Sequence, residues 1–158
     1  MFNFTQSVDS GSLLASRLYS QDDFYLAFVN DLKKAKQQVI IESPFITTKR
    51  MNILLPILSQ LAKCGVRVIV NTKPIDEHES GYQLQAQEAI GQMQELGILV
   101  LMTAGHHRKL AVIDKQVLWE GSLNILSQND SCEVMRRIYS VQLANQMLAF
   151  LHLEKFIG

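Results

Sequence analysis

Residues 107–124 constrain the fold more than any other part of the chain, because they combine a strand pattern with a dense set of polar side chains. Two apolar, β-prone segments, 110–113 and 117–119, flank three polar residues at 114–116. This arrangement predicts two antiparallel strands joined by a tight turn. A β-hairpin is therefore expected here.

The open end of the predicted hairpin carries four groups that can bind or attack phosphate. His107 and Lys109 are two residues apart, and because side chains alternate along a strand, both are expected on one face. The second strand runs back antiparallel and ends beside them with Ser122 and Asn124. An imidazole, an ammonium, a hydroxyl and an amide are thus expected to converge at one end of the hairpin.

The rest of the chain alternates between strand-like and helix-like segments. Apolar runs predict strands at 39–41, 66–70, 98–102 and 133–138, and apolar residues at helical spacing predict helices at 24–36, 48–64, 80–96 and 141–156. Thr48 is expected to cap the second helix, and Ser80 with Gln83 to form a capping box at the third. With the hairpin added, this alternation indicates an α/β fold, in which a mixed β-sheet is covered by helices on both faces.

Length and composition bound the class of protein. At 158 residues and 47% apolar, the chain suits a single domain over 1–158, in which 1–19 is interpreted as an arm or an edge strand. The net charge is zero, so any basic surface for nucleic acid must be local. Cys64 and Cys132 are too few for a disulfide framework or a zinc site. Neither a signal peptide nor an apolar run of about 18 residues is seen, which predicts a soluble cytoplasmic protein.

The polar residues of the hairpin resemble the signature of a known family, the phospholipase D superfamily. Its pattern, H-x-K-x(4)-D-x(6)-G-S-x-N, is matched in register by His107, Lys109, Asp114, Gly121, Ser122 and Asn124. The order of elements around the motif is also similar to that of the small bacterial nucleases of this superfamily. One position departs from many members, because Lys115 follows the aspartate where they have glycine. That departure concerns the geometry of the turn and leaves the chemistry intact.

The resemblance implies that a phosphodiester is cleaved in two steps, without a metal or another cofactor. His107 attacks phosphorus to form a phosphohistidine, and a second histidine protonates the departing oxygen. Lys109 and the Asn124 amide donate to non-bridging phosphate oxygens, and Ser122 adds a donor or orients its neighbours. Family members also carry an acidic residue beyond the asparagine that orients a histidine ring, and Glu133 is the candidate.

Other polar residues have less specific interpretations. Asp114 belongs to the candidate site, but its turn position favours backbone hydrogen bonds over contact with substrate. His106 is expected on the other side of the strand, where packing or exposure accounts for it. His78 and His152 have no partners at metal-ligand spacing, so no metal site is expected.

Basic residues outside the motif could also contact phosphate. Arg136 and Arg137 alternate along the last strand, so only one of them can face the cleft. Lys49, Arg50 and Lys73 follow strand ends, where α/β proteins place binding loops, but they are interpreted as solvated charges.

A single copy of the motif is present, whereas a complete site in this family uses two. The resemblance therefore implies a homodimer in which both chains contribute a histidine, a lysine and an asparagine to one shared site. The favoured function is a nuclease acting on nucleic acid, with DNA preferred to RNA and no membrane involved. Two alternatives stay open: phospholipid hydrolysis or headgroup transfer, and a non-catalytic nucleic-acid-binding module of a helicase or restriction assembly. Lipid-cleaving relatives generally carry two motifs in a longer chain, and no amphipathic membrane helix is evident.

Overall fold

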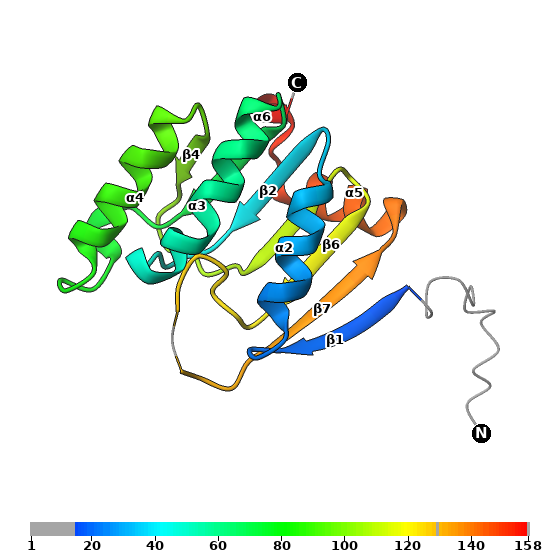
Figure 1. Ribbon diagram of the computed structural model, residues 1–158, viewed down its shortest axis with the longest axis horizontal. Helices are drawn as coiled ribbons and strands as arrows, with labels where there is room; N and C mark the ends of the chain where they lie inside the picture. The colour runs from blue at the N-terminus through cyan, green and yellow to red at the C-terminus, as the bar shows by residue number, and fades with distance from the viewer. Residues whose placement is uncertain (1–14, 129, 158) are drawn as a thin grey trace.

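The computed structural model describes residues 15–128 and 130–157, which contain a seven-stranded mixed sheet (Figure 1). The strands are β1 (Ser16–Ser20), β2 (Gln38–Glu42), β3 (Arg67–Thr72), β4 (Leu99–Met102), β5 (Leu110–Ile113), β6 (Val117–Gly121) and β7 (Val134–Tyr139). Their order across the sheet is β1-β7-β6-β5-β2-β3-β4. β2, β3 and β4 run parallel to one another, and the remaining pairings are antiparallel. The predicted mixed sheet is confirmed.

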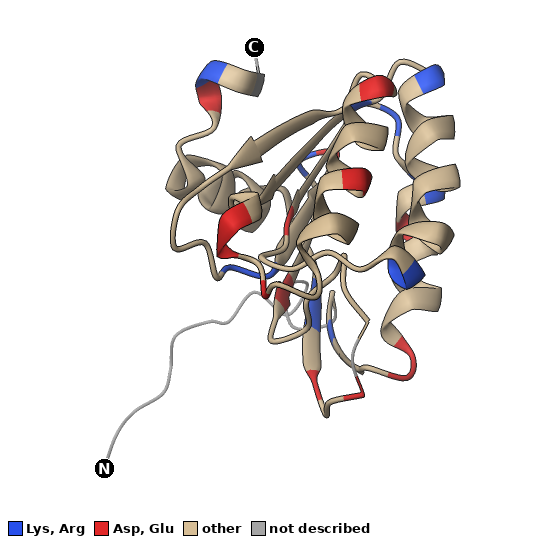
Figure 2. Ribbon diagram, turned by 90° about the vertical axis from the view of Figure 1, so that its left-hand side faces the viewer, with Lys and Arg blue, Asp and Glu red and all other residues tan. Residues whose placement is uncertain are grey.

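Helices cover both faces of this sheet, as predicted. On one face lie α2 (Phe24–Lys34), α3 (Thr48–Lys63) and α4 (Gln83–Glu95), and on the other lie α5 (Val141–Leu151) and then α6 (Glu154–Ile157) (Figures 1 and 2). A short 3₁₀ turn, η1 (Ile75–Glu77), precedes α4. Because strand side chains alternate, Ile41 and Val70 belong to the core under α2–α4, whereas Ile40 and Ile69 belong to the core under α5.

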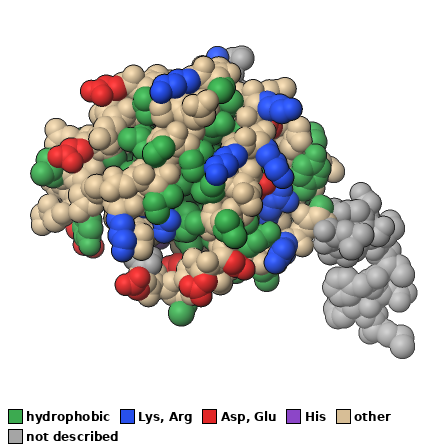
Figure 3. Space-filling model, in the orientation of Figure 1, with side chains coloured by type: hydrophobic (Ala, Val, Ile, Leu, Met, Phe, Trp, Pro, Cys, Tyr) green, Lys and Arg blue, Asp and Glu red, His purple; other side chains and the backbone are tan. Residues whose placement is uncertain are grey.

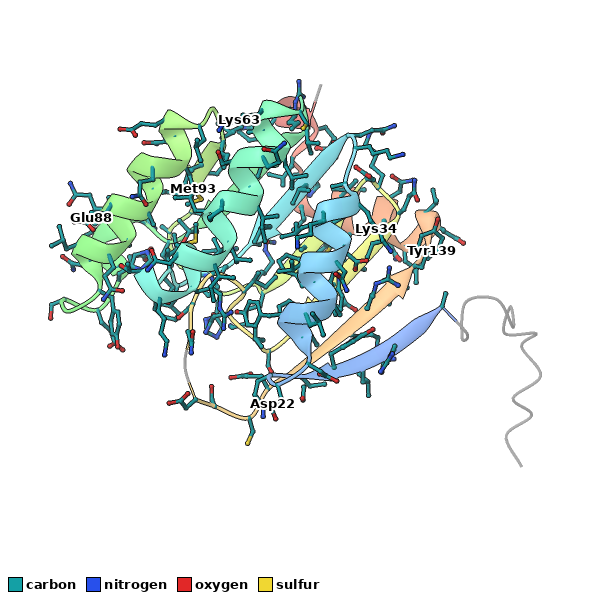
Figure 4. All side chains as sticks on the ribbon, viewed as in Figure 1. Asp22, Lys34, Lys63, Glu88, Met93 and Tyr139 are labelled. Atoms are coloured by element: carbon teal, nitrogen blue, oxygen red, sulfur yellow. The ribbon has the colours of Figure 1, made fainter. Side chains whose placement is uncertain are left out.

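The helices bury the apolar faces that their sequences predict. In α4, Ala86, Ala89, Ile90 and Met93 are buried and Glu88 is exposed. Figure 4 shows Met93 on the side of α4 toward α3, and Glu88 on the outer side. The helical spacing of apolar residues therefore located the helices and their inward faces correctly.

The starts of two helices differ from the predicted caps. Thr47, not Thr48, is the N-cap of α3, and its hydroxyl accepts a hydrogen bond of 3.5 Å from a backbone N–H of the first turn. The predicted capping box at α4 is wrong, because Ser80 lies before the helix and Gln83 donates to a backbone carbonyl of the preceding loop. Single-residue positions of caps depend on how the preceding loop packs, which the local sequence leaves open.

Near both ends of the chain, the structure differs from the predicted elements or defines them further. The helix predicted for 141–156 is two helices, because His152 adopts a left-handed conformation with φ 52° and α5 ends before it. Leu153 then turns into the core under α5. At the other end, β1 pairs with β7 as an edge strand, while residues 1–14 of the predicted arm lie outside the described residues. The domain boundaries at 1 and 158 stay a prediction.

Candidate functional site

The hairpin predicted from the sequence is present as β5 and β6. The two strands pair antiparallel along their length, and the turn between them holds Asp114 and Lys115 at φ 52° and 55°. Positive φ at both turn residues is the geometry of tight hairpin turns, and it is uncommon for residues other than glycine, asparagine and aspartate. Lys115 thus adopts the conformation that a glycine would adopt at lower cost.

The Asp114 carboxylate ties this turn to the loop that enters β2. Its Oδ1 accepts from the backbone N–H groups of Gln37 and Gln38 at 2.8 and 2.9 Å, and its Oδ2 accepts from that of Lys36 at 2.9 Å. The prediction that Asp114 makes backbone hydrogen bonds is confirmed, but their donors lie before and at the start of β2 and not within the hairpin. The turn lies at the opposite end of the hairpin from the other five candidate residues, so the structure separates Asp114 from them.

His107 and Lys109 lie on an extended segment that precedes β5. The strand spans Leu110–Ile113, as the apolar run predicts, so His107 and Lys109 precede the strand and do not lie on it. The Lys109 carbonyl still accepts from the N–H of Gly121 at 3.3 Å, which keeps the segment beside the end of β6. The Lys109 ammonium donates to the His107 carbonyl at 2.8 Å. Both residues nevertheless line the same groove, as predicted from their spacing.

Ser122 and Glu133 are in direct contact where β6 and β7 meet. The Ser122 hydroxyl donates to one oxygen of the Glu133 carboxylate, and the Ser131 hydroxyl donates to the other at 2.8 Å. Gly121 is required just before them, because a Cβ there would lie 2.1 Å from the Val134 carbonyl. The close approach that this glycine allows is therefore to the backbone of β7.

Asn124 lies in the loop that follows β6, and this loop is fixed against the start of α3. The Tyr25 hydroxyl lies 2.8 Å from the carbonyl of Ile125, and burial raises the pKa of this phenol, so it stays a donor. The hydroxyls of Ser43 and Thr47 accept from backbone N–H groups of the same loop at 3.1 and 3.0 Å. The backbone that follows Asn124 is thus held by α2, by the residue after β2 and by the N-cap of α3.

Five of the six candidate residues line one open groove of about 960 Å³: His107, Lys109, Ser122, Asn124 and Glu133. Its other walls include the charged residues Arg108, Glu120 and Arg136 and the apolar residues Leu18, Met147 and Phe150. The groove thus combines an imidazole, an ammonium and an amide, which together can bind and attack a phosphodiester.

Positive charge gathers beside this groove although the chain is neutral overall. Burial is the main cause that lowers the pKa of Lys109; Glu133 opposes the shift and Lys73 adds to it. Lys73 directly follows β3, and its interpretation as a solvated charge missed this proximity. Its place at the carboxyl end of a parallel strand, where open sheets bind ligands, was the available signal.

Arg136 and Arg137 face opposite sides of β7, as their alternation predicts. Arg136 lines the groove. Arg137 instead forms an ion pair with Asp31, with 2.7 Å between Nε and Oδ2, and Trp119 Nε1 donates to the same oxygen at 2.8 Å. Arg137 therefore belongs to the packing of α2 against the sheet.

Two buried residues lie next to the His107–Lys109 segment: Glu42, which the sequence did not single out, and His106. The Glu42 carboxylate, at the end of β2, lies 2.8 Å from Nε of Arg108, and burial raises its pKa against the opposing effect of Asn71 and Arg108. His106 is 3% exposed, as packing would require. Burial foremost, and then the neighbouring positive charges, lower the pKa of His106 to about 4.

The other histidines and the cysteines lie apart from the groove. His78 is buried, with a ring nitrogen 3.2 Å from the Lys73 carbonyl, and His152 follows α5. Cys64 and Cys132 are free thiols. Within residues 15–128 and 130–157, no three His, Cys, Asp or Glu side chains are grouped so that they could hold a metal ion.

The groove and the fold around it correspond to a known family. The family model described as "Cardiolipin synthase, PLD-like domain" matches residues 28–153. The chain belongs to the phospholipase D superfamily. The matched range includes all of the hairpin and its polar residues, and it confirms the family predicted from the motif. No curated protein matches the chain in sequence.

Solved structures share this phospholipase D-like fold. Nuc from Salmonella typhimurium, a phospholipase D family member, is 15% identical over 85% of this chain and 90% of its own, with a TM-score of 0.70. NucT from Helicobacter pylori is 17% identical over 85% and 91%, also with a TM-score of 0.70. Phosphatidylserine synthase from Haemophilus influenzae is 15% identical over 90% of this chain but only 38% of its own, with a TM-score of 0.61. At these identities the likeness concerns the fold.

The helices of the described residues are short relative to a bilayer. None of them combines the length and the apolar character needed to cross a membrane.

Proposed function

We propose that the protein is a phosphodiesterase, and specifically a nuclease that cleaves nucleic acid through a phosphohistidine intermediate. The observation that carries the proposal is the single open groove lined by His107, Lys109, Ser122, Asn124 and Glu133. A phosphodiester in this groove would meet a nucleophile and two donors, Lys109 and the Asn124 amide, because the Ser122 hydroxyl already donates to Glu133. Lys109 and Asn124 would bind the non-bridging oxygens, whose charge rises in the transition state.

Both steps of this reaction balance with side chains and water alone. In the first step, a ring nitrogen of neutral His107 bonds to phosphorus, the bond to the leaving oxygen breaks, and a second, protonated histidine gives that oxygen its proton. In the second step, the second histidine, now neutral, takes a proton from water as the water oxygen bonds to phosphorus. The phosphorus–nitrogen bond then breaks and His107 is restored.

The second histidine would come from a second copy of the chain, because this groove is lined by one histidine. Exposed apolar side chains surround the groove: Leu18 is 54% exposed, Val134 48% and Phe150 63%. Exposed apolar side chains that gather in one region of a surface mark sites of protein–protein contact. We infer a two-fold dimer in which these side chains are covered and two grooves face each other.

Local charge supports nucleic acid as the substrate. Arg108, Lys109 and Arg136 line the groove and Lys73 lies beside it, so a basic footprint exists despite zero net charge. On the face formed by α2, α3 and α4, basic and acidic side chains both occur among apolar and polar ones (Figure 3).

The test of the activity is incubation of the purified protein with labelled DNA, labelled RNA and phosphatidylcholine vesicles, each in excess EDTA. We expect DNA to be cut and the His107→Ala protein to be inactive while it keeps its fold. If only the vesicles were hydrolysed, the proposed nuclease activity would be wrong and the protein would be a phospholipid hydrolase. Loss of all activity in EDTA, with recovery on adding a divalent ion, would refute the metal-independent route.

The shared site is tested by mixing subunits. Co-expressed wild-type and His107→Ala chains, carrying different affinity tags, yield a purified heterodimer with one intact histidine. We expect this heterodimer to be nearly inactive in turnover, because one ring attacks and the other donates a proton. Half of the wild-type activity per heterodimer, or an active monomer in sedimentation, would contradict the shared site.

A further inference from the structure

A second hollow, which we call the aromatic hollow, lies beside the groove and has a volume of about 200 Å³. Its walls include Phe45, Thr47, Glu79, Tyr82, Asn124 and Gln128. Phe45 follows β2, Tyr82 immediately precedes α4, and Asn124 lies after β6, so the hollow forms only when distant segments come together. The cleavage chemistry proposed above uses only Asn124 among these residues.

Two residues connect the aromatic hollow to the groove. Asn124 lines both of them. Lys73 lies over the Phe45 ring, with its Nζ 4.7 Å from the ring centroid. Its charge also contributes to lowering the pKa of Lys109 in the groove. A ligand whose phosphate is held by Lys109 and Asn124 can therefore continue into the hollow.

We propose that the aromatic hollow is a subsite for the nucleobase that flanks the scissile phosphate. The inference rests on the proposed nuclease function and names where part of that substrate binds. Tyr82 is 45% exposed and Phe45 is partly exposed, so each ring has surface free for a ligand. Nucleobases stack on such rings whatever their identity, because every base has a π-face.

The charges around the hollow favour a neutral ring there over a second phosphate. Glu79 lines the hollow and would repel an anion, whereas Lys73 and Lys109 attract the phosphate toward the groove. Phe45 is also held in place, because the His78 ring packs against it edge-on at 6.1 Å between centroids. A fixed aromatic wall needs little ordering when the base binds.

The experiment compares binding of two single-stranded oligonucleotides of equal length, one of thymidylate and one with abasic sugars throughout. Both carry the same backbone charge, so their difference reports the bases alone. Dissociation constants are measured by fluorescence anisotropy in the His107→Ala chain, which removes cleavage from the measurement. We expect Tyr82→Ala to weaken thymidylate binding roughly fivefold or more and to leave abasic binding unchanged.

Three further variants make the result specific. Tyr82→Phe keeps the ring and should restore thymidylate binding, and Phe45→Ala should repeat the base-dependent loss from the opposite wall. Leu84→Ala, at a residue that is 66% exposed near the same end of α4 but outside the hollow, should change neither constant. Equal weakening for both oligonucleotides, no weakening, or no binding of either one would overturn the subsite. Because cleavage is measured separately with the wild-type chain, a protein that cuts DNA without base-dependent binding would refute the subsite alone.

Discussion

The carboxylate of Glu42 lies 2.8 Å from Nε of Arg108, the residue between His107 and Lys109. Glu42 is fully buried at the end of β2, and it also accepts from the Asn71 amide at 3.0 Å. The contact pins the middle of a segment that has no strand partners of its own before residue 109. Glu42 therefore holds His107, the proposed nucleophile, and Lys109 in place without lining the groove itself.

Glu42→Gln should reduce turnover while the fold persists. The change removes the charge that holds Arg108, but burial raises the pKa of Glu42, so loss of a buried carboxylate relieves a desolvation cost. We expect kcat to fall by about tenfold or more, the effect of a small misplacement of reacting groups, with little change in the free energy of unfolding. Glu42→Asp is the matched control and should recover part of the rate. Unchanged kcat in Glu42→Gln would show that Arg108 needs no anchor.

Arg108→Ala should behave differently, because it leaves the Glu42 carboxylate buried without its cation. We expect a destabilisation on the order of 1–3 kcal/mol at neutral pH, reduced by the partial exposure of Arg108. A raised folded-state pKa means that Glu42 favours folding most when it is protonated and least once pH exceeds that pKa. The destabilisation should therefore shrink as pH falls through the acidic range. Urea unfolding at neutral and acidic pH measures it; the same loss at both values would contradict the role of Glu42.

Lys109→Ala should lower turnover by roughly 10²–10³-fold, the scale for loss of one transition-state donor. Lys109→Arg keeps the charge and serves as the matched variant. Single-turnover rates with labelled DNA are the measurement, and a loss below about threefold would remove Lys109 from the role of oxyanion clamp.

Lys73→Met should move the alkaline limit of activity. Burial and then the charge of Lys73 lower the pKa of Lys109, so Lys109 loses its proton at a lower pH than an ordinary lysine. Activity that needs the ammonium is present below this pKa and is lost as pH rises through it. Without the Lys73 charge the pKa of Lys109 should rise, and the alkaline limb of the rate profile should shift to higher pH. Lys49→Met is the control. If the alkaline limb stayed at the same pH or moved to lower pH in Lys73→Met, the charge of Lys73 would not influence the pKa of Lys109.

His106 should make stability fall in mild acid. Its folded-state pKa of about 4 lies below the ordinary value of 6.5. Between these two pH values His106 is protonated in the unfolded chain and neutral in the folded chain. The stabilisation that neutral, buried His106 gives the fold is complete above the pKa of the unfolded chain and is lost as pH falls toward 4. It amounts to roughly 3 kcal/mol. His106→Gln should flatten this slope, as measured by urea unfolding at several pH values. An unchanged slope would assign the acid sensitivity to other groups.

The sequence by itself determined the family motif, the alternation of strands and helices and the hairpin. Each of these is a local property: the apolar spacing of α4 repeats every turn, and the residues from 107 to 124 are brought together by one two-strand unit. The same locality led to the correct separation of Arg136 from Arg137, because alternation along a strand needs no knowledge of the rest of the fold.

Only the tertiary structure decided which distant residues lie at the groove and at the aromatic hollow beside it. Lys73, Glu42 and Phe45 each follow or end a parallel strand, and they come together because β2 and β3 pair in register and end at the same edge of the sheet. The N-cap at Thr47 and the break at His152 likewise depend on what packs against them. Contacts between residues far apart in the chain carry no local period, so the pattern of the sequence could not reveal them.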